Sequence, residues 1–280
     1  MKQEVAVAAW AESDDARSEA MQALVSQWRP ADEWPGFAAA DATQTGGLAT
    51  RGYFGAVCDG RYVYFVPEQH GEGGYPTHGN VLRLDTLSDF RDPSSFSAYD
   101  AGHTQGLQTR GYYGAVFDGR YVYFVPRQID MDLYHSRVLR LDTTGDFHDP
   151  ASWDAHDVGE AHSQQSAVFD GRYIYFCPGF SGDPHKEDEY CGRVIRYDTR
   201  AGFHDPSAYV SIDMTTFLGK QAACFDGGAF DGRYVYFVPL YEGYAVRYDT
   251  QAPFDSPEAW QGYDVRPHGF KLAVGAVFDG

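Results

Sequence analysis

The sequence predicts an all-β fold, a β-propeller of about five blades, each a four-stranded antiparallel sheet. A phrase close to Gly-Ala-Val-Phe-Asp-Gly-Arg-Tyr-Val-Tyr-Phe-Val-Pro recurs along the 280-residue chain, the last copy stopping at Asp-Gly. These Asp-Gly pairs begin at Asp59, Asp118, Asp170, Asp231 and Asp279. A period of this length, built from short strands, is typical of a repeat architecture. Four-stranded sheets repeated around an axis form a propeller.

The second repeat shows how the four strands are expected to follow one another. Residues 114–117 are apolar and end at Asp118-Gly119, a dipeptide that favours a two-residue hairpin turn. Residues 120–125 are apolar or aromatic at nearly every position, which indicates a strand buried on both faces. Residues 138–143 are the predicted third strand and residues 153–158 the fourth. Between them, Asp149 is the expected N-cap of a single helical turn that begins at Pro150.

Two sets of recurring acids have structural explanations. Polarity rises from the first strand to the fourth, which places the first strand at the crowded centre and the fourth at the rim. An acid late in each fourth strand discourages edge-to-edge aggregation. An acid followed by Thr after each third strand is expected to bond its own backbone in a turn. The first set is Asp41, Asp100, Asp157, Asp213 and Asp264, and the second is Asp85, Asp142, Asp198 and Asp249.

The two ends of the sequence raise the question of how the repeat closes. Residues 37–67 match residues 96–126 without a gap, so the repeat is expected to begin on a fourth strand and to leave on a first strand before Gly280. Both termini would then supply strands of a fifth blade. Residues 4–10 offer a middle strand and residues 14–28 an amphipathic helix, which gives an N-terminal segment (1–36) and a propeller (37–280). The alternative is an incomplete fifth blade in a piece of a longer propeller.

Composition narrows the expected partners and location. The net charge of −18 repels phosphate backbones, so we expect no nucleic-acid partner. No apolar run is long enough for a membrane span, and the N-terminal one is short for a signal peptide. We therefore expect a cytoplasmic protein, with secretion as the alternative, and no membrane partner. Cys58 and Cys224 are predicted to be small buried thiols, whereas Cys177 and Cys191 flank one loop and are either bridged or free.

The repeat unit resembles kelch-type propeller repeats. The shared order is an apolar first strand, a turn, Tyr-Val-Tyr, Arg-Tyr-Asp and a later Trp, as in Tyr248 and Trp260. A kelch repeat has two glycines after its second strand, where this chain has Val-Pro, as at Val66-Pro67 and Val125-Pro126. The resemblance implies a propeller fold and carries no function with it.

A column of basic residues just before each first strand is the main predicted binding site. Counting back from the Asp-Gly turns gives Arg51, Arg110, His162 and Lys271, with Lys220 near the column if the fourth turn is Asp226-Gly227. A ring of such groups at a channel mouth would suit a carboxylate, phosphate or sulfate. The alternative is that each cation pairs with an acid of the neighbouring blade.

Aromatic and amide residues follow this column directly. Tyr53, Phe54, Tyr112 and Tyr113 would form an apolar wall beside the charges, as in many small-ligand pockets. Gln164 and Gln165 replace them in the third repeat, so this face is expected to bind something asymmetric. The alternative is packing between blades.

The loops between second and third strands carry acids and histidines. They cover residues 68–80, 127–137 and 179–193, and include His70, His78, His135 and His185. Their spacing matches no calcium or zinc motif, so we expect neither a metal nor another cofactor. No acylation, metalloprotease or phosphate-loop motif is present, and no unique pair of carboxylates stands out.

The sequence therefore favours a non-catalytic binding module. Its partner would be a small anionic or carbohydrate-like ligand, or a protein, on the channel-mouth face. The alternative is a propeller enzyme, a glycoside hydrolase or lyase, that uses loop carboxylates and histidines. A third hypothesis is a purely structural domain. A dimer is expected if the fifth blade is open.

Overall fold

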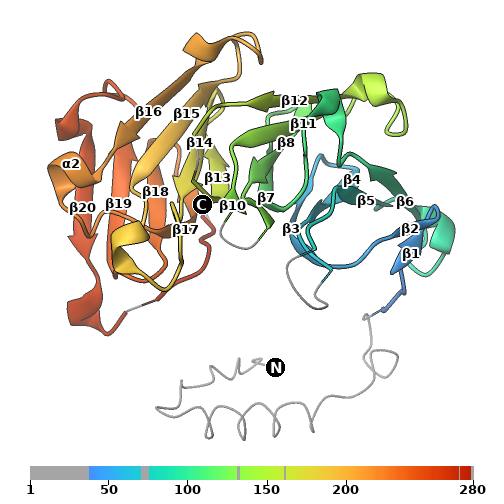
Figure 1. The fold of residues 1–280 in the computed structure, drawn as a ribbon, viewed down its shortest axis with the longest axis horizontal. Helices are drawn as coiled ribbons and strands as arrows, with labels where there is room; N and C mark the ends of the chain where they lie inside the picture. The colour runs from blue at the N-terminus through green and yellow to red at the C-terminus, as the bar shows by residue number, and fades with distance from the viewer. Residues whose placement is uncertain (1–37, 71–75, 131–132, 161, 271, 279–280) are drawn as a thin grey trace, which may run out of the picture. The chain divides into compact units, whose positions relative to one another are not determined.

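Four four-stranded antiparallel sheets account for most of the computed structural model, which describes residues 38–70, 76–130, 133–160, 162–270 and 272–278 (Figure 1). The first sheet comprises β3 (Tyr53–Cys58), β4 (Tyr62–Pro67), β5 (Asn80–Asp85) and β6 (Phe96–Asp100). The second comprises β7 (Tyr112–Phe117), β8 (Tyr121–Pro126), β11 (Arg137–Asp142) and β12 (Trp153–Asp157). The third comprises β13 (Gln164–Phe169), β14 (Tyr173–Pro178), β15 (Arg193–Asp198) and β16 (Tyr209–Asp213). The fourth comprises β17 (Phe225–Phe230), β18 (Tyr234–Pro239), β19 (Tyr244–Asp249) and β20 (Trp260–Asp264).

Short elements fill the connections. Two small hairpins are β1 (Gln44–Thr45) with β2 (Leu48–Ala49), and β9 (Gln128–Asp130) with β10 (Leu133–Tyr134). One α-helical turn is α2 (Thr215–Leu218), and the 3-10 turns are η2 (Pro93–Ser95), η3 (Thr104–Gly106), η4 (Pro150–Ser152), η5 (Glu187–Glu189), η6 (Pro206–Ala208), η7 (Pro257–Ala259) and η8 (Arg266–His268). Asp149 caps η4 by accepting a hydrogen bond from the Ala151 amide, as predicted.

The hairpin between the first two strands of each sheet is closed by an aspartate side chain. In the second sheet, Asp118 accepts hydrogen bonds from the Arg120 and Tyr121 amides and from the Tyr123 hydroxyl. Arg120 then forms an ion pair with Asp142 at the end of β11, at 2.6 Å. The same bonds recur in the other three sheets, so this part of the repeat is structural.

The inner strands β3, β7, β13 and β17 pack side by side in chain order (Figure 1). Each carries a β-bulge, and the bulge residue has a positive φ. A Cβ atom on Gly55 would lie 3.7 Å from the Cα atom of Gly114, and one on Gly114 would lie 3.4 Å from that of Ser166. Glycine suits these positions because it accepts positive φ and lets the backbones approach. The bulge residues are Gly55, Gly114, Ser166 and Gly227.

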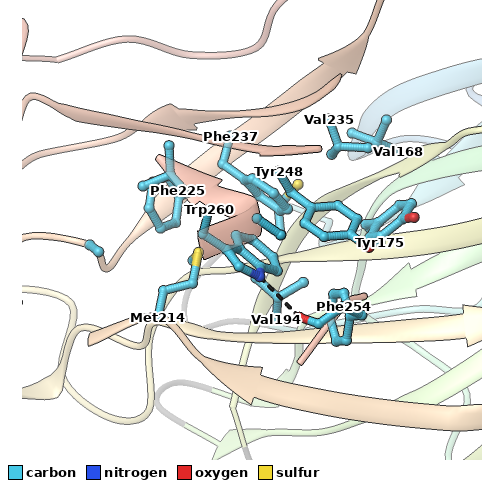
Figure 2. Packing of buried hydrophobic residues seen from close by; sticks show 14 residues of the cluster. Val168, Tyr175, Val194, Met214, Phe225, Val235, Phe237, Tyr248, Phe254 and Trp260 are labelled. Atoms are coloured by element: carbon cyan, nitrogen blue, oxygen red, sulfur yellow. Dashed lines mark hydrogen bonds between the residues drawn. The ribbon is translucent and has the colours of Figure 1, made fainter. Parts of the chain in front are cut away.

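Apolar side chains fill the spaces between successive sheets. Figure 2 shows the cluster between the third and fourth sheets, where Tyr175 meets Tyr248 and Phe254. The buried Trp260 indole donates a hydrogen bond to the Phe254 carbonyl oxygen at 3.0 Å (Figure 2). Large rings therefore fill the wedge between these two sheets, and the Trp260 indole keeps a hydrogen-bond partner there.

The prediction of an all-β, propeller-type repeat with four-stranded antiparallel sheets is confirmed at this level. The number of blades in a closed ring and the kelch resemblance stay predictions. The described residues 38–41 and 272–278 form no strand. The Gly275 amide nevertheless donates to the Asp226 carbonyl oxygen at 2.8 Å, beside β17. The predicted N-terminal segment (1–36), with its strand at 4–10 and its helix at 14–28, lies outside the described residues.

Some predictions for single residues are corrected. Cys58 is exposed at the end of β3, not buried, whereas Cys224 is buried as predicted; Cys177 and Cys191 are both free thiols. Asp226-Gly227 is not the fourth hairpin turn, because both residues lie in β17 and the turn is Asp231-Gly232. In the part of the chain that the structure describes, no helix is long and apolar enough to cross a membrane.

Candidate functional site

Four side chains, one from each inner strand, make up what we call the axial column. They are the residues just before the four bulges: Phe54, Tyr113, Gln165 and Asp226. The Phe54 and Tyr113 rings stack with their centres 3.5 Å apart. The Tyr113 hydroxyl lies 3.5 Å from the Asp226 Oδ2 atom, which joins the second sheet to the fourth. Residues 113 positions apart in the chain therefore meet because the sheets share an axis.

Arg127 and Glu68 lie next to this column. Each is the first residue after the Pro that ends a second strand, Glu68 after β4 and Arg127 after β8. The Arg127 guanidinium carbon lies 4.3 Å from the centre of the Tyr113 ring, and the same guanidinium forms an ion pair with Glu68. A cation over an aromatic face is attracted by the ring quadrupole.

Burial governs the charges here. Asp226 is only 5% exposed, and burial raises the pKa of its carboxyl to about 6, against the opposing effects of Arg127 and of the Tyr113 hydrogen bond. Burial also raises the pKa of Glu68, although Arg127 opposes it. Removing a carboxylate from water disfavours its charged form. The Arg127 guanidinium is thus close to two buried carboxyl groups, those of Asp226 and Glu68.

Two buried glutamines add polar groups without protein partners. Gln165 is 1% exposed; its Nε2 atom is 3.4 Å from the Ser163 hydroxyl, and its Oε1 atom has no partner among the described residues. Gln164 is fully buried, and neither atom of its amide has a partner in that same set. Buried polar atoms are normally hydrogen-bonded to protein, water or ligand. Three side-chain amide atoms of these two residues therefore have no protein partner among the described residues.

An aromatic cluster lies at the Asp226 end of the fourth sheet. Phe180 and Tyr190 have ring centres 5.9 Å apart, and Tyr190 stacks with Tyr241 at 5.7 Å. Phe180 packs on Cys224, two residues before Asp226. Burial, and the nearby Asp226 charge, raise the pKa of the Cys224 and Cys177 thiols, so both stay protonated and unreactive.

The described members of the predicted basic column differ in exposure, and whether they act together stays a prediction. Arg51 is exposed and Arg110 half-buried. His162 is buried, with its Nε2 atom 3.2 Å from the Arg193 carbonyl oxygen. Lys220 lies in the exposed turn before β17, and counting back from the true turn at Asp231 gives Ala223 in its place. Lys271 lies outside the described residues.

The predicted aromatic wall divides in two. Tyr53 and Tyr112 point into their own sheets, where Tyr112 packs on Phe124 and His135 and donates to the Arg137 carbonyl oxygen at 3.1 Å. Tyr113, with Phe54, lies in the axial column instead. Gln164 occupies the position of Tyr112, and Gln165 that of Tyr113.

Two histidines of the variable loops, His78 and His135, bond to the backbone. Burial lowers the pKa of His78 and of His135 to about 4. The Nε2 atom of His78 donates to the Gly52 carbonyl oxygen, and that of His135 to the Arg110 carbonyl oxygen, both at 3.0 Å. In the described ranges, no group of three His, Cys, Asp or Glu side chains is arranged to hold a metal ion.

Sequence reasoning missed Asp226, Glu68 and Arg127. The signal for Asp226 was present, because alignment from Asp231 places it in the column of Phe54, Tyr113 and Gln165. Glu68 and Arg127 gave no such signal, since they open loops that vary from repeat to repeat.

Comparison with known proteins adds fold neighbours but no family. No protein family model matches the chain, and no curated protein matches it. Solved structures similar to it include a nidogen/laminin complex (12% identity, 73% of this chain and 64% of that chain, TM-score 0.44). Another is the periplasmic gluconolactonase of Pseudomonas aeruginosa (16% identity, 77% of this chain and 57% of that chain, TM-score 0.46). A third is the WD40 domain of Toxoplasma gondii coronin (13% identity, 72% of this chain and 43% of that chain, TM-score 0.41). The chain thus spans less than two thirds of the length of each.

Proposed function

We propose that this protein binds a small, hydroxyl-rich, carbohydrate-like ligand at the axial column without transforming it. The observation that carries the proposal is the buried amide of Gln165, whose Oε1 atom has no partner among the described residues. Gln165 occupies the position where the first two sheets carry Phe54 and Tyr113, so the repeat is interrupted within the axial column. The neighbouring Gln164 amide also has no partner among these residues, but it occupies the position of Tyr112 and lies outside the column. Buried amides without partners are costly unless a bound molecule completes their hydrogen bonds.

The charges favour a neutral ligand over an anion. Asp226 and Glu68 are both buried, and Arg127 already pairs with Glu68. An added carboxylate or phosphate would meet two acidic groups and one guanidinium that is already engaged. Sugar hydroxyls, in contrast, can donate to Asp226 and accept from Arg127 or from a glutamine amide.

The aromatic side chains give the site its apolar component. Phe54 is the exposed member of the axial column and stacks on Tyr113. Tyr241 is also exposed, and it stacks on Tyr190 in the aromatic cluster next to Cys224. Small-ligand sites commonly combine such rings with a few convergent polar groups.

A binding screen tests the proposal. Isothermal titration with a panel of mono- and oligosaccharides should find a ligand for the wild-type protein, and Gln165→Leu should weaken its binding at least about tenfold, the loss of one or two buried hydrogen bonds. The control is the Arg51→Ala, Arg110→Ala double variant, which should bind normally. Loss of binding in the control but not in Gln165→Leu would move the site to the basic column and contradict the proposal.

A catalytic role is the second candidate, favoured by the carboxyl of Asp226. An acid with a pKa of about 6, next to the Tyr113 hydroxyl, is suited to general acid catalysis. An enzyme would release product from the ligand found in the screen, and Asp226→Asn would abolish the release while binding persists. Binding without product in the wild type would exclude this role for that ligand.

A further inference from the structure

The axial column leaves hydrogen-bond acceptors for a ligand. Within the described residues, the Oε1 atom of Gln165 has no partner, whereas its Nε2 atom donates to the Ser163 hydroxyl at 3.4 Å. The Asp226 carboxyl accepts from one described side chain, the Tyr113 hydroxyl, at the long distance of 3.5 Å. Carboxylate oxygens can each accept more than one hydrogen bond. A molecule that completes these bonds must therefore bring donors.

Arg127 adds a single donor beside these acceptors. Its guanidinium pairs with Glu68 and lies over the Tyr113 ring, whose hydroxyl reaches Asp226. Its buried Nε atom has no partner in the part of the chain that the structure describes. A ligand with a strong donor next to an acceptor would therefore serve both Asp226 and Arg127.

The Gln165 amide and the Asp226 carboxyl both border the end of β14. A Cβ atom on Gly179, the residue after β14, would lie 2.7 Å from the Gln165 Nε2 atom, so the amide lies against this glycine. The charge of Asp226 acts on Cys177, two residues earlier, and helps to raise the pKa of that thiol. Glycine at position 179 thus leaves room for the amide, where the other sheets carry Glu68, Arg127 and Leu240.

The charges of the site favour a cation. Asp226 and Glu68 are both buried, and Arg127 is the described cation that acts on both carboxyl groups. When both carboxyl groups are ionised, one negative charge stays without a compensating cation, and a buried charge without a partner is costly. The net charge of −18 also draws cations toward the protein.

We infer that the ligand of the axial column is an amino sugar, whose protonated amine binds the Asp226 carboxylate and the Gln165 Oε1 atom. The inference rests on the proposed function, because it names the class of sugar that the same site takes. An ammonium group carries three donors and no acceptor, which matches the free acceptors of the column. The sugar hydroxyl next to the amine can accept from the Arg127 Nε atom. Hydrogen bonds between charged groups are stronger than neutral ones, so the amine should raise the affinity.

Isothermal titration of the full chain at about pH 7 tests the inference with two matched series of sugars. One series is glucosamine, N-acetylglucosamine and glucose, and the other is the corresponding set of galactose sugars. Each amine should bind at least about tenfold more tightly than the other two members of its series. Asp226→Asn should remove this preference, because it removes the charge that distinguishes an ammonium from a neutral group. The exposed Asp255→Asn changes the net charge equally and should keep the preference.

A pH series gives a second readout. The groups that face Asp226 are the Arg127 guanidinium, the Tyr113 hydroxyl and the thiols of Cys177 and Cys224. Burial raises the pKa of that hydroxyl and of both thiols, so they stay neutral at pH 5 to 7. The Asp226 carboxyl, with a pKa of about 6, takes up a proton in this interval, so the preference for amines should fall from pH 7 to pH 5. Asp226→Asn should show no such fall, which separates Asp226 from Glu68, whose pKa burial also raises.

The outcomes distinguish this inference from the proposed function. Neutral sugars that bind as tightly as the amines would overturn the inference and leave the proposed function standing. A preference for amines that survives in Asp226→Asn would do the same, once circular dichroism shows that the variant is folded. Failure of every sugar, in these series and in the wider panel, would overturn both.

Discussion

Asp226 occupies a position where two sister strands carry aromatic rings, and the exchange creates a buried acid at the meeting point of the sheets. Its carboxyl interacts with the hydroxyl of Tyr113 and the charge of Arg127, neither of which comes from its own sheet. A buried carboxyl with a raised pKa favours its protonated form in the folded state. The folded protein then binds more protons than the unfolded chain, so this residue makes stability fall as pH rises from about 4 to about 6.

Asp226→Asn should therefore stabilise the protein at neutral pH. The rise in pKa from 3.8 to about 6 limits the gain in the free energy of unfolding to about 3 kcal/mol. We expect a gain of about 1–3 kcal/mol at pH 7 and little at pH 4. Urea unfolding at several pH values between 4 and 8 measures the effect. The exposed Asp255→Asn is the control. An equal effect of Asp226→Asn at pH 4 and pH 7 would show that ionisation of Asp226 is not its cause.

At the scale of elements, the bulge in each inner strand sets the distance between neighbouring sheets. The bulge turns the residue before it, Phe54, Tyr113, Gln165 or Asp226, into the axial column. Three of the four bulge residues are glycines, whereas Ser166 carries its positive φ of 119° with a side chain. The close approach of the strands and the position of the candidate site thus depend on the same local feature.

Gly114→Ala should destabilise the protein more than Gly119→Ala. Both glycines have φ values near +90° to +100°, so both substitutions strain the backbone, but only the Cβ atom at position 114 meets a neighbouring strand, 3.2 Å from the Ser166 hydroxyl oxygen. We expect a cost of about 1–2 kcal/mol at position 119, and about 1–3 kcal/mol more at position 114. Thermal and urea unfolding measure both variants. Equal costs would mean that the inner strands separate readily.

At the scale of the whole molecule, sheets stabilise one another through a contact that only the internal faces complete. Phe147 lies between the first and second sheets, close to Tyr64, Tyr99 and Arg83. Phe90 is its equivalent on a face that no described sheet covers. The same residue type in the same repeat position thus has two environments, which differ in whether a preceding sheet of the described residues covers the ring.

Substituting Phe147 and Phe90 in turn measures how much the contact between sheets contributes to stability. Phe147→Ala should lower the free energy of unfolding by about 3–5 kcal/mol, the usual cost of removing a buried aromatic ring. Phe90→Ala should cost less than about 1 kcal/mol when the protein is dilute. Urea unfolding of both variants at low concentration makes the comparison. A large cost for Phe90→Ala under these conditions would show that another part of the protein covers the first sheet.

The repeat itself was readable in the sequence because its causes are local. Asp118 with Tyr123 closes a hairpin, Arg120 with Asp142 ties it to the third strand, and Asp149 with Pro150 begins the turn before the fourth. Each of these contacts joins residues close in sequence, or strands that are neighbours in one sheet, so each leaves its pattern in every repeat. The order of the strands and the all-β class followed from these patterns alone.

Only the tertiary structure decided which side chains meet between sheets. Tyr113 and Asp226 are joined by the arrangement of four sheets and not by any spacing. In the same way, only the structure shows that the buried His162 bonds to the Arg193 carbonyl oxygen. A repeat specifies its own internal contacts, and the contacts across the axis depend on the curvature that stacking the sheets produces. The candidate site is a property of that stacking.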